Sequence, residues 1–472
     1  MEKSFQIKNN VMEKSFKWHA GFSAFAFIII LFTSCKKNSD STPPPVLPTI
    51  TSFSPVTGSA GATVTISGKN FSPTITNDVV SFNGIVAVIS SATVNQIIAI
   101  VPNDATTGKV SVKVSSNTAT SSSDFTVLAL TVTFSLARSG HTAASLGNKI
   151  YFGGGYDGTQ ADGNIDIYDV DASKWTLAQL SVPRFNFAAA SAGHKVVFAG
   201  GETDAALPAP VSSVVDIYDD DTKTWSTAHL SEPSYYLSAG SAGNKIIFGG
   251  GVVDTGVSYN VDIYDAVNNT WAKHLLGDRR GHANIIGAGS KILIAGGLNG
   301  YTSTSSLDYF FRSVDIYDVN TDSWSQANLS VARGGMGIAA SGNKIVFAGG
   351  YTKNAAYNEV LSKTVDIYDA SDDTWSTSQL AVAANYSCAA ASGNKILFVR
   401  DQDFSSGSIS GTVDIYDVVT GIWSSSTLSE PRVSMAAAGA GNKIVFAGGW
   451  SSVNGFSKTV DIYDAQTGVW TH

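Results

Sequence analysis

The chain has 472 residues, which exceeds the length of one ordinary hydrophobic core and predicts two or more domains. Charged residues make up only 14% of it, glycine occurs 45 times, and the formal net charge is −8 at pH 7. Low charge with many glycine, β-branched and aromatic residues favours an all-β globular protein, and the lack of a basic stripe argues against nucleic-acid binding. The two cysteines, Cys35 and Cys388, exclude a disulfide framework and a cysteine-based zinc site.

Residues 1–34 have the order of a secretory signal peptide, with lysines first, then the apolar run Ala24–Phe32, then two small residues. The run is nine residues long, which is too short to span a bilayer comfortably. Because the letters MEKSF occur at Met1 and again at Met12, a start at Met12 is an alternative that leaves a signal of conventional length. The sequence therefore predicts an exported protein.

Cys35 directly follows Thr33 and Ser34, and this placement resembles the lipobox of bacterial lipoproteins. Phe32 stands where that family more often has leucine. The resemblance implies lipidation of Cys35 and attachment to the outer membrane, on its periplasmic face or at the cell surface. An ordinary cleaved signal with an incidental cysteine is the alternative. Residues 35–47 are polar and rich in proline, which predicts a tether between the lipid and the folded part.

Residues 48–128 alternate apolar and polar residues between clusters of Gly, Pro and Asn, which predicts the short half-buried strands of a sandwich. The segments PTITSFSPVTGSAGATVTISGKNF (Pro48–Phe71), VSFNG (Val80–Gly84) and TGKVSVKV (Thr107–Val114) resemble, in the same order, the IPT/TIG family of immunoglobulin-like domains. The resemblance implies an Ig-like spacer or binding module without catalytic residues. The stretch indeed contains no histidine, no cysteine and no cluster of acidic residues.

Residues 129–472 repeat one pattern seven times, and each copy contains the letters VDIYD or a close variant. A copy starts with small residues and a tight turn such as Gly147-Asn148-Lys149, and an apolar run that usually ends in Gly-Gly follows. The VDIYD segment comes next, and a tryptophan lies seven positions after the tyrosine of that segment. Successive copies lie 46 to 53 residues apart, a period typical of propellers. Turn residues between alternating runs predict four antiparallel strands per copy, named a to d, which is the structure of a propeller blade.

The Gly-Gly pair, the tyrosine and the later tryptophan together resemble the kelch motif. Seven copies imply an all-β chain in which an Ig-like β-sandwich is followed by a seven-bladed kelch β-propeller. The sixth copy departs from the pattern, because it has Val399-Arg400 where the others have Gly-Gly. The last d strand is short, since the chain stops two residues after Trp470, and Leu130–Ser135 are expected to complete that blade from the N-terminal side.

The repeated aromatic residues are interpreted as structural, because chemistry needs a residue once whereas a fold needs it in every blade. They are the pairs Tyr168 and Trp175, Tyr218 and Trp225, Tyr264 and Trp271, Tyr317 and Trp324, Tyr368 and Trp375, Tyr416 and Trp423, and Tyr463 and Trp470. The aspartates of VDIYD are expected to bond to turn amides or to neighbouring blades. A metal at each copy would need further ligands that the loops do not repeat, so no metal site and no cofactor are predicted.

The loops between strands b and c vary in length, and in an up-and-down blade they open on the same face as the links from strand d to the next strand a. That face, the mouth of the propeller, is therefore the predicted place of function. Five of the seven links carry an arginine: Arg138, Arg184, Arg280, Arg333 and Arg432. The arginines either bond to carbonyl groups at the top of each blade or form a ring of cations that holds an acidic or hydroxyl-rich ligand.

Aromatic residues also gather in the predicted mouth. They are Tyr156, Tyr351 and Trp450 after the Gly-Gly pairs, Tyr235, Tyr236 and Tyr386 at the links, and Tyr301, Tyr309, Phe310, Phe311, Tyr357 and Phe456 in long b–c loops. Exposed aromatic rings beside Asn, Asp and Ser suit sugar rings and also protein partners. Packing of the loops onto the scaffold is the alternative for each ring. The sequence predicts a lipid-anchored binding protein that recognises a glycan or a protein at this face and touches a membrane only through its lipid.

An enzymatic reading stays open as the alternative. Sugar-modifying kelch enzymes such as the sialic acid mutarotases would need an acid–base pair at the mouth, but no spacing singles out a pair among Glu202, Glu232, Glu359 and Glu430. His141 and His282 are expected at equivalent positions of strand a, each as a satisfied inner-strand histidine. A copper radical oxidase is disfavoured, because Cys388 lies in a run of small residues that predicts a buried thiol. No catalytic residue is assigned.

Overall fold

The computed structural model describes residues 47–472 except 59–61, 103–104, 128–133, 206–209, 255, 300–309, 355–357 and 404–407. The predicted signal, Cys35 and nearly all of the tether lie outside the described residues. The chain forms two compact units, Met1–Leu130 and Thr131–His472. Within the part that the structure describes, no helix is long and apolar enough to cross a membrane.

The first unit is an Ig-like sandwich of two sheets, with strand orders β1-β3-β7-β6 and β2-β9-β8-β4-β5. Apolar residues alternate along strands such as β3 and β8, and Ile66 of one sheet and Val112 of the other are fully buried in one core. The alternation is the reason for the sandwich, because each strand has one face to bury. The elements are β1 (Thr49–Ser54), β2 (Thr57–Gly58), β3 (Thr63–Lys69), the 3-10 helix η1 (Ile75–Asn77), β4 (Asp78–Phe82), β5 (Ile85–Val86), β6 (Val88–Ala92), β7 (Gln96–Ile100), β8 (Gly108–Val114) and β9 (Asn117–Val127).

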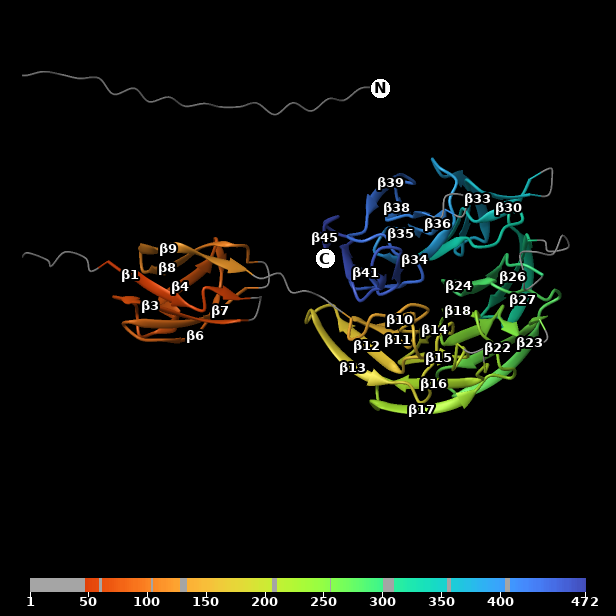
Figure 1. The fold of residues 1–472 in the computed structure, drawn as a ribbon, viewed down its shortest axis with the longest axis horizontal. Helices are drawn as coiled ribbons and strands as arrows, with labels where there is room; N and C mark the ends of the chain where they lie inside the picture. Colours follow the sequence, from red (N-terminus) through yellow and green to blue (C-terminus); the bar gives the residue numbers. More distant parts are fainter. Residues whose placement is uncertain are drawn as a thin grey trace, which may run out of the picture. The chain divides into compact units, whose positions relative to one another are not determined.

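The second unit is a propeller of seven four-stranded sheets, counted over the described residues, which follow one another around a ring (Figure 1). In blades 1 to 4 the strands are β10 (Thr142–Leu146), β11 (Lys149–Gly153), β12 (Asn164–Asp169) and β13 (Lys174–Gln179); β14 (Ala188–Ala192), β15 (Lys195–Ala199), β16 (Val214–Asp219) and β17 (Thr224–His229); β18 (Ser238–Ala242), β19 (Lys245–Gly249), β22 (Asn260–Asp265) and β23 (Thr270–Leu275); and β24 (Asn284–Ala288), β25 (Lys291–Ala295), β26 (Ser313–Asp318) and β27 (Ser323–Asn328).

In blades 5 to 7 the strands are β28 (Gly337–Ser341), β29 (Lys344–Ala348), β32 (Thr364–Asp369) and β33 (Thr374–Gln379); β34 (Tyr386–Ser392), β35 (Lys395–Arg400), β38 (Thr412–Asp417) and β39 (Trp423–Thr427); and β40 (Ala436–Ala440), β41 (Lys443–Ala447), β44 (Val460–Asp464) and β45 (Trp470–Thr471). Among the described residues, four b–c loops form short hairpins of their own. They are β20 (Val252–Val253) with β21 (Gly256–Val257), β30 (Tyr351–Lys353) with β31 (Glu359–Leu361), β36 (Gln402–Asp403) with β37 (Ser408–Ile409), and β42 (Trp450–Ser451) with β43 (Gly455–Phe456).

Each blade is antiparallel in the order a-b-c-d, as the sequence predicts, with the a strands inside the ring and the d strands outside (Figure 1). The b strands are the most apolar, and their residues after the first are buried between neighbouring blades. The a strands consist of small residues because seven of them must meet around one axis. At Gly287, an added Cβ would lie 1.8 Å from the carbonyl oxygen of Ser241 in the preceding blade, so only glycine fits.

The ring closes between blades 7 and 1. Strand β45, the d strand of blade 7, pairs with β44 only at Trp470–Tyr463 and Thr471–Ile462. The C-terminal segment therefore leaves the rest of β44 unpaired on its outer side. Phe134 fills the gap: its N–H donates to the Lys458 carbonyl at 3.1 Å, as the N–H of Leu180 does to Gly163 in blade 1. Phe134 is 1% exposed and packs in the core between the two blades. The described end of Leu130–Ser135 therefore completes the last blade, while residues 130–133 lie outside the described part.

Candidate binding surface at the mouth of the propeller

The repeated tyrosines and tryptophans lie opposite each other on strands c and d of every blade. Their ring centroids are 4.8 to 5.1 Å apart in all seven pairs. Such cross-strand aromatic pairs bury large apolar area and hold blade to blade. They lie away from the mouth, so these fourteen residues serve the fold.

The second aspartate of each VDIYD segment organises the turn between strands c and d. In blade 6, Asp417 Oδ1 accepts hydrogen bonds from the N–H groups of Val419 and Thr420, and its Oδ2 pairs with Lys395 Nζ at 2.6 Å. Every blade has a lysine directly after its a–b turn and an aspartate at this position. In blade 6, the ion pair between them connects strand b to the c–d turn. Within the described residues no group of three or more His, Cys, Asp and Glu is placed to hold a metal ion.

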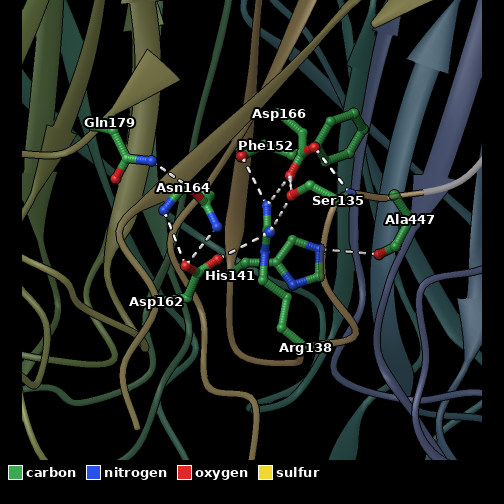
Figure 2. A network of polar contacts seen from close by, with 9 residues as sticks. All are labelled: Ser135, Arg138, His141, Phe152, Asp162, Asn164, Asp166, Gln179 and Ala447. Atoms are coloured by element: carbon green, nitrogen blue, oxygen red, sulfur yellow. Dashed lines mark hydrogen bonds and ion pairs between the residues drawn. The ribbon is translucent and has the colours of Figure 1, made fainter. Parts of the chain in front are cut away.

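The five arginines of the d–a links are buried, with 0 to 1% of each exposed. Each pairs with the first aspartate of its own blade's VDIYD segment, as Arg138 Nη2 does with Asp166 Oδ2 at 2.6 Å and Arg184 Nη2 with Asp216 Oδ2 at 2.6 Å. Figure 2 shows the first network, in which Arg138 also contacts Asp162 and the carbonyl of Phe152. The alternative of bonding within the blade is the one the structure supports. A ring of cations open to a ligand is not what these side chains form.

Two links lack the arginine, and the structure treats them differently. In blade 3, Ser234 replaces it, and Asp262 is held by the backbone N–H and hydroxyl of Ser231. In blade 6, Ala384 replaces it, and Arg400 at the end of strand b supplies the guanidinium group instead. Arg400 Nε and Nη2 contact the two oxygens of Asp414 at 2.8 Å each. The departure from Gly-Gly in blade 6 thus places an arginine at the end of strand b, and this arginine replaces the one that is missing from the link.

The mouth is edged by residues two positions after the link arginine, or after Ser234 in blade 3, and four of them are non-glycine residues with a left-handed backbone. The φ values are 53° at Asn186, 47° at Tyr236, 51° at His282 and 53° at Ser434. Backbone hydrogen bonds connect these positions from blade to blade: Gly140 N–H to Ser434 O, Asn186 N–H to Gly140 O, and Tyr236 N–H to Asn186 O. A left-handed tyrosine or histidine is unfavourable by itself, and such residues concentrate at binding and catalytic sites.

Four aromatic residues, here named the aromatic strip, run across blades 7, 1 and 2 at the mouth: Trp450, Phe456, Tyr156 and Phe185. Trp450 and Phe456 are direct partners in the β42–β43 hairpin. Tyr156 lies 5.9 Å from Phe456 and 5.4 Å from Phe185, centroid to centroid. Trp450 is 38% exposed, and the other three rings are half-buried. The strip therefore places ring contacts across three blades and one exposed tryptophan on the same hairpin as Phe456.

The remaining predicted rim residues divide into two groups. Tyr235 is half-buried, and its ring lies 5.1 Å from that of Tyr236, which in turn lies 5.1 Å from His282. Tyr351 is half-buried in the β30–β31 hairpin. Tyr386 is buried instead, because its hydroxyl donates to Asp414 at 2.8 Å beneath the mouth. Tyr386 therefore belongs to the interior of blade 6 and not to the rim.

The two histidines are not equivalent, contrary to expectation. His282 occupies the left-handed position and is exposed, whereas His141 lies one position later in its blade and is buried. His141 Nε2 is 3.0 Å from the Ala447 carbonyl, so Nε2 carries the proton and the bond joins blade 1 to blade 7 (Figure 2). Burial and the nearby Arg138 lower the pKa of His141 well below its usual value. His141 is buried directly before strand β10, and only one of its two ring nitrogens is bonded, since Nδ1 has no hydrogen-bond partner among the described residues; the predicted satisfied inner-strand histidine is therefore confirmed only in its burial.

Other titratable groups near the mouth are shifted by burial. Glu202 is buried, its Oε2 accepts a hydrogen bond from Asn186 at 2.7 Å, and burial raises its pKa. Burial also raises the pKa of the Cys388 thiol to about 12, so the thiol is protonated at neutral pH. Cys388 as a whole is half-buried and not buried as predicted, while a protonated thiol agrees with the predicted inert role.

The comparisons with known proteins agree with this architecture. Residues 48–127 match the family model of the IPT/TIG domain, residues 140–330 match the KLHDC2/KLHL20/DRC7 Kelch-repeats domain, and residues 431–472 match the Kelch motif. The chain is a kelch-repeat propeller protein with an N-terminal IPT/TIG domain. Among solved structures, one described as "Structure of YjhT" is 14% identical and covers 72% of this chain and 98% of its own, with a TM-score of 0.46. No curated protein gives a significant match.

Sequence reasoning missed two features of this kelch propeller's mouth. Phe185 follows a link arginine and gave no signal of its own, since only its contact with Tyr156 in the neighbouring blade reveals it. The role of Arg400 was also hidden, although the simultaneous loss of the link arginine at Ala384 could have suggested the exchange.

Proposed function

We propose that this protein is a lipid-anchored binding protein of the outer membrane that recognises a glycan at the mouth of its kelch propeller. The observation that carries the proposal is the aromatic strip, which joins three blades and leaves Trp450 38% exposed. Aromatic faces stack on the C–H faces of sugar rings, and the polar side chains around them bond to hydroxyl groups. The order of residues 1–35 supports the anchor.

The chemistry of the mouth favours binding over catalysis. The link arginines, which an enzyme would use to hold a charged substrate, are occupied by aspartates inside the blades. The strip itself contains only aromatic residues and no titratable acid or base that could move a proton at neutral pH. A rigid aromatic surface loses little conformational entropy when a ligand binds, which suits recognition.

A glycan-array screen of residues 39–472, which contain the Ig-like sandwich and the propeller, tests the proposal. We expect specific binding that is weakened about tenfold or more in Trp450→Ala, because the most exposed ring of the strip is lost. Val453→Ala is the matched control, since Val453 is 86% exposed in the turn of the same hairpin. Silence across the array for the unmodified protein would contradict the glycan proposal and point to a protein partner.

Glu202 gives the enzymatic alternative its one specific observation, because a buried carboxyl group with a raised pKa suits proton transfer. If the mouth interconverts sugar anomers, NMR exchange spectra of reducing sugars will show a rate enhancement that Glu202→Gln abolishes. Binding without any enhancement keeps the protein in the binding class.

A further inference from the structure

Blade 6 differs from the other blades in how it neutralises its buried aspartate. The five link arginines are at most 1% exposed, whereas the side chain of Arg400 is 22% exposed. Arg400 reaches Asp414 from the end of strand b, so the link position holds only the small side chain of Ala384. The exchange removes a long side chain from the junction between blades 5 and 6 and turns a guanidinium group partly toward solvent.

A pocket of about 400 Å³ lies at this junction. Its walls include Leu361 and Val382 from blade 5 and its link, and Ala384, Asn385, Arg400 and Asp401 from blade 6. A volume of this size is at the lower end of the range for small-molecule sites and fits a single sugar ring. The pocket lies where blade 6 departs from the other blades both in its link, at Ala384, and at the end of strand b, at Arg400.

The walls of the pocket combine apolar surface with donors and acceptors. Leu361 and Val382 supply apolar contacts, and the buried Asn385 supplies an amide. Arg400 uses Nε and Nη2 for Asp414, which leaves Nη1 to donate elsewhere. Asp401 adds a carboxyl group. Hydroxyl groups both donate and accept, so a ring with hydroxyl edges and apolar faces matches this arrangement.

The charge of the pocket selects against an acidic ligand. Asp414 neutralises Arg400, and Asp401 is a second carboxyl group, whose Oδ1 accepts a hydrogen bond from the N–H of Gln402 and which forms no ion pair with the described residues. Burial raises the pKa of Asp401, so the pocket disfavours the charged form of this carboxyl group, and the pocket would disfavour a buried ligand carboxylate for the same reason. A neutral ligand avoids this penalty.

We propose that the pocket between blades 5 and 6 binds a neutral, hydroxyl-rich ring of hexose size, held by Arg400, Asp401 and Asn385. The site is separate from the aromatic strip, which lies on blades 7, 1 and 2. It therefore stands or fails independently of the function proposed above.

Saturation-transfer NMR of residues 39–472 with glucose, galactose, N-acetylglucosamine and glucuronate tests the pocket. We expect transfer to at least one of the neutral sugars and a weaker effect on glucuronate. Ala383→Phe places a ring in the pocket and is expected to reduce affinity about tenfold or more. Ala332→Phe is the matched control, because Ala332 occupies the same link position in blade 5, where Arg333 fills the blade. Trp450→Ala is expected to leave this binding unchanged.

A second pair of variants tests the same pocket with substitutions at exposed positions, where misfolding is not expected. Val382→Trp and its blade 5 counterpart Val331→Trp change side chains that are 53% and 37% exposed, so both are expected to fold. Absence of transfer from every neutral sugar would overturn the proposal. Binding that persists in both Ala383→Phe and Val382→Trp would place the ligand elsewhere, and a preference for glucuronate would refute the neutral ligand class.

Discussion

At the scale of single residues, the close packing of the a strands depends on glycines, which have no side chain. Small residues in the a strands could be predicted from their recurrence, but the sequence does not say which glycine touches a neighbouring backbone. Gly287 and Gly439 do so: an added Cβ would lie 1.8 Å and 1.9 Å from carbonyl oxygens of the preceding blade. The same limit explains the error over His141 and His282, since a shift of one residue decides between core and mouth.

Gly287→Ala is expected to destabilise the propeller by about 1–3 kcal/mol, because the new Cβ forces two a strands apart. Gly277→Ala is the control, since an added Cβ at Gly277 meets no atom within 4 Å and its φ is not left-handed. Urea denaturation of both variants checks the difference. Equal stabilities would show that the a strands are not in close contact.

His141 is expected to make stability fall as the pH drops. Its pKa in the folded state lies below the usual value of about 6.5, so below that pH the unfolded chain takes up a proton that the folded chain does not. The free energy of unfolding should decrease between about pH 7 and pH 5, and less steeply in His141→Gln. Denaturation across this range tests the difference, with the exposed His194→Gln as control. Parallel slopes in all three proteins would contradict it.

At the scale of the blade, the repeated pattern predicts the strands and their order because alternation and turn residues are local signals. It could not predict the arginine–aspartate pairs, whose partners come from different segments and meet only once the blade has formed. Where both charges are buried, removal of the arginine leaves an aspartate without its cation inside the blade, which is unfavourable. Blade 6 keeps a cation, which arrives from strand b there, whereas blade 3 holds Asp262 with hydrogen bonds from Ser231.

Moving the arginine of blade 6 from strand b to the link tests directly whether the buried aspartate of that blade depends on a cation. Arg400→Gly leaves Asp414 with Tyr386 as its remaining side-chain partner and is expected to cost about 3–5 kcal/mol. Adding Ala384→Arg should restore much of the stability, because it rebuilds the pairing seen in five other blades. Chemical denaturation of both single variants and the double variant measures the coupling. Strictly additive effects would refute a shared aspartate.

At the scale of the whole molecule, both units and the number of blades could be predicted, because each rests on a pattern that recurs or spans a complete domain. The binding surface could not be predicted in the same detail. The aromatic strip draws one residue from each of two blades and two from a third, so it exists only in the closed ring. The predicted ring of arginine cations failed for the same reason, since burial follows from the packed blade.

Closure of the ring is expected to depend on Phe134. Phe134→Ala removes a side chain that is 1% exposed between blades 7 and 1, and we expect a loss of about 3–5 kcal/mol. Calorimetry should show a lower melting temperature for the propeller and an unchanged transition for the IPT/TIG domain. An unchanged propeller transition would mean that strand β45 closes the ring without help from the N-terminal side.

The most direct measurement of the central claim is a titration of the strongest glycan from the array against three proteins: residues 39–472 unmodified, with Trp450→Ala, and with Val453→Ala. We expect that Trp450→Ala weakens binding about tenfold or more while Val453→Ala binds like the unmodified protein. Equal affinities in all three proteins, or the same loss in both variants, would contradict recognition by the aromatic strip.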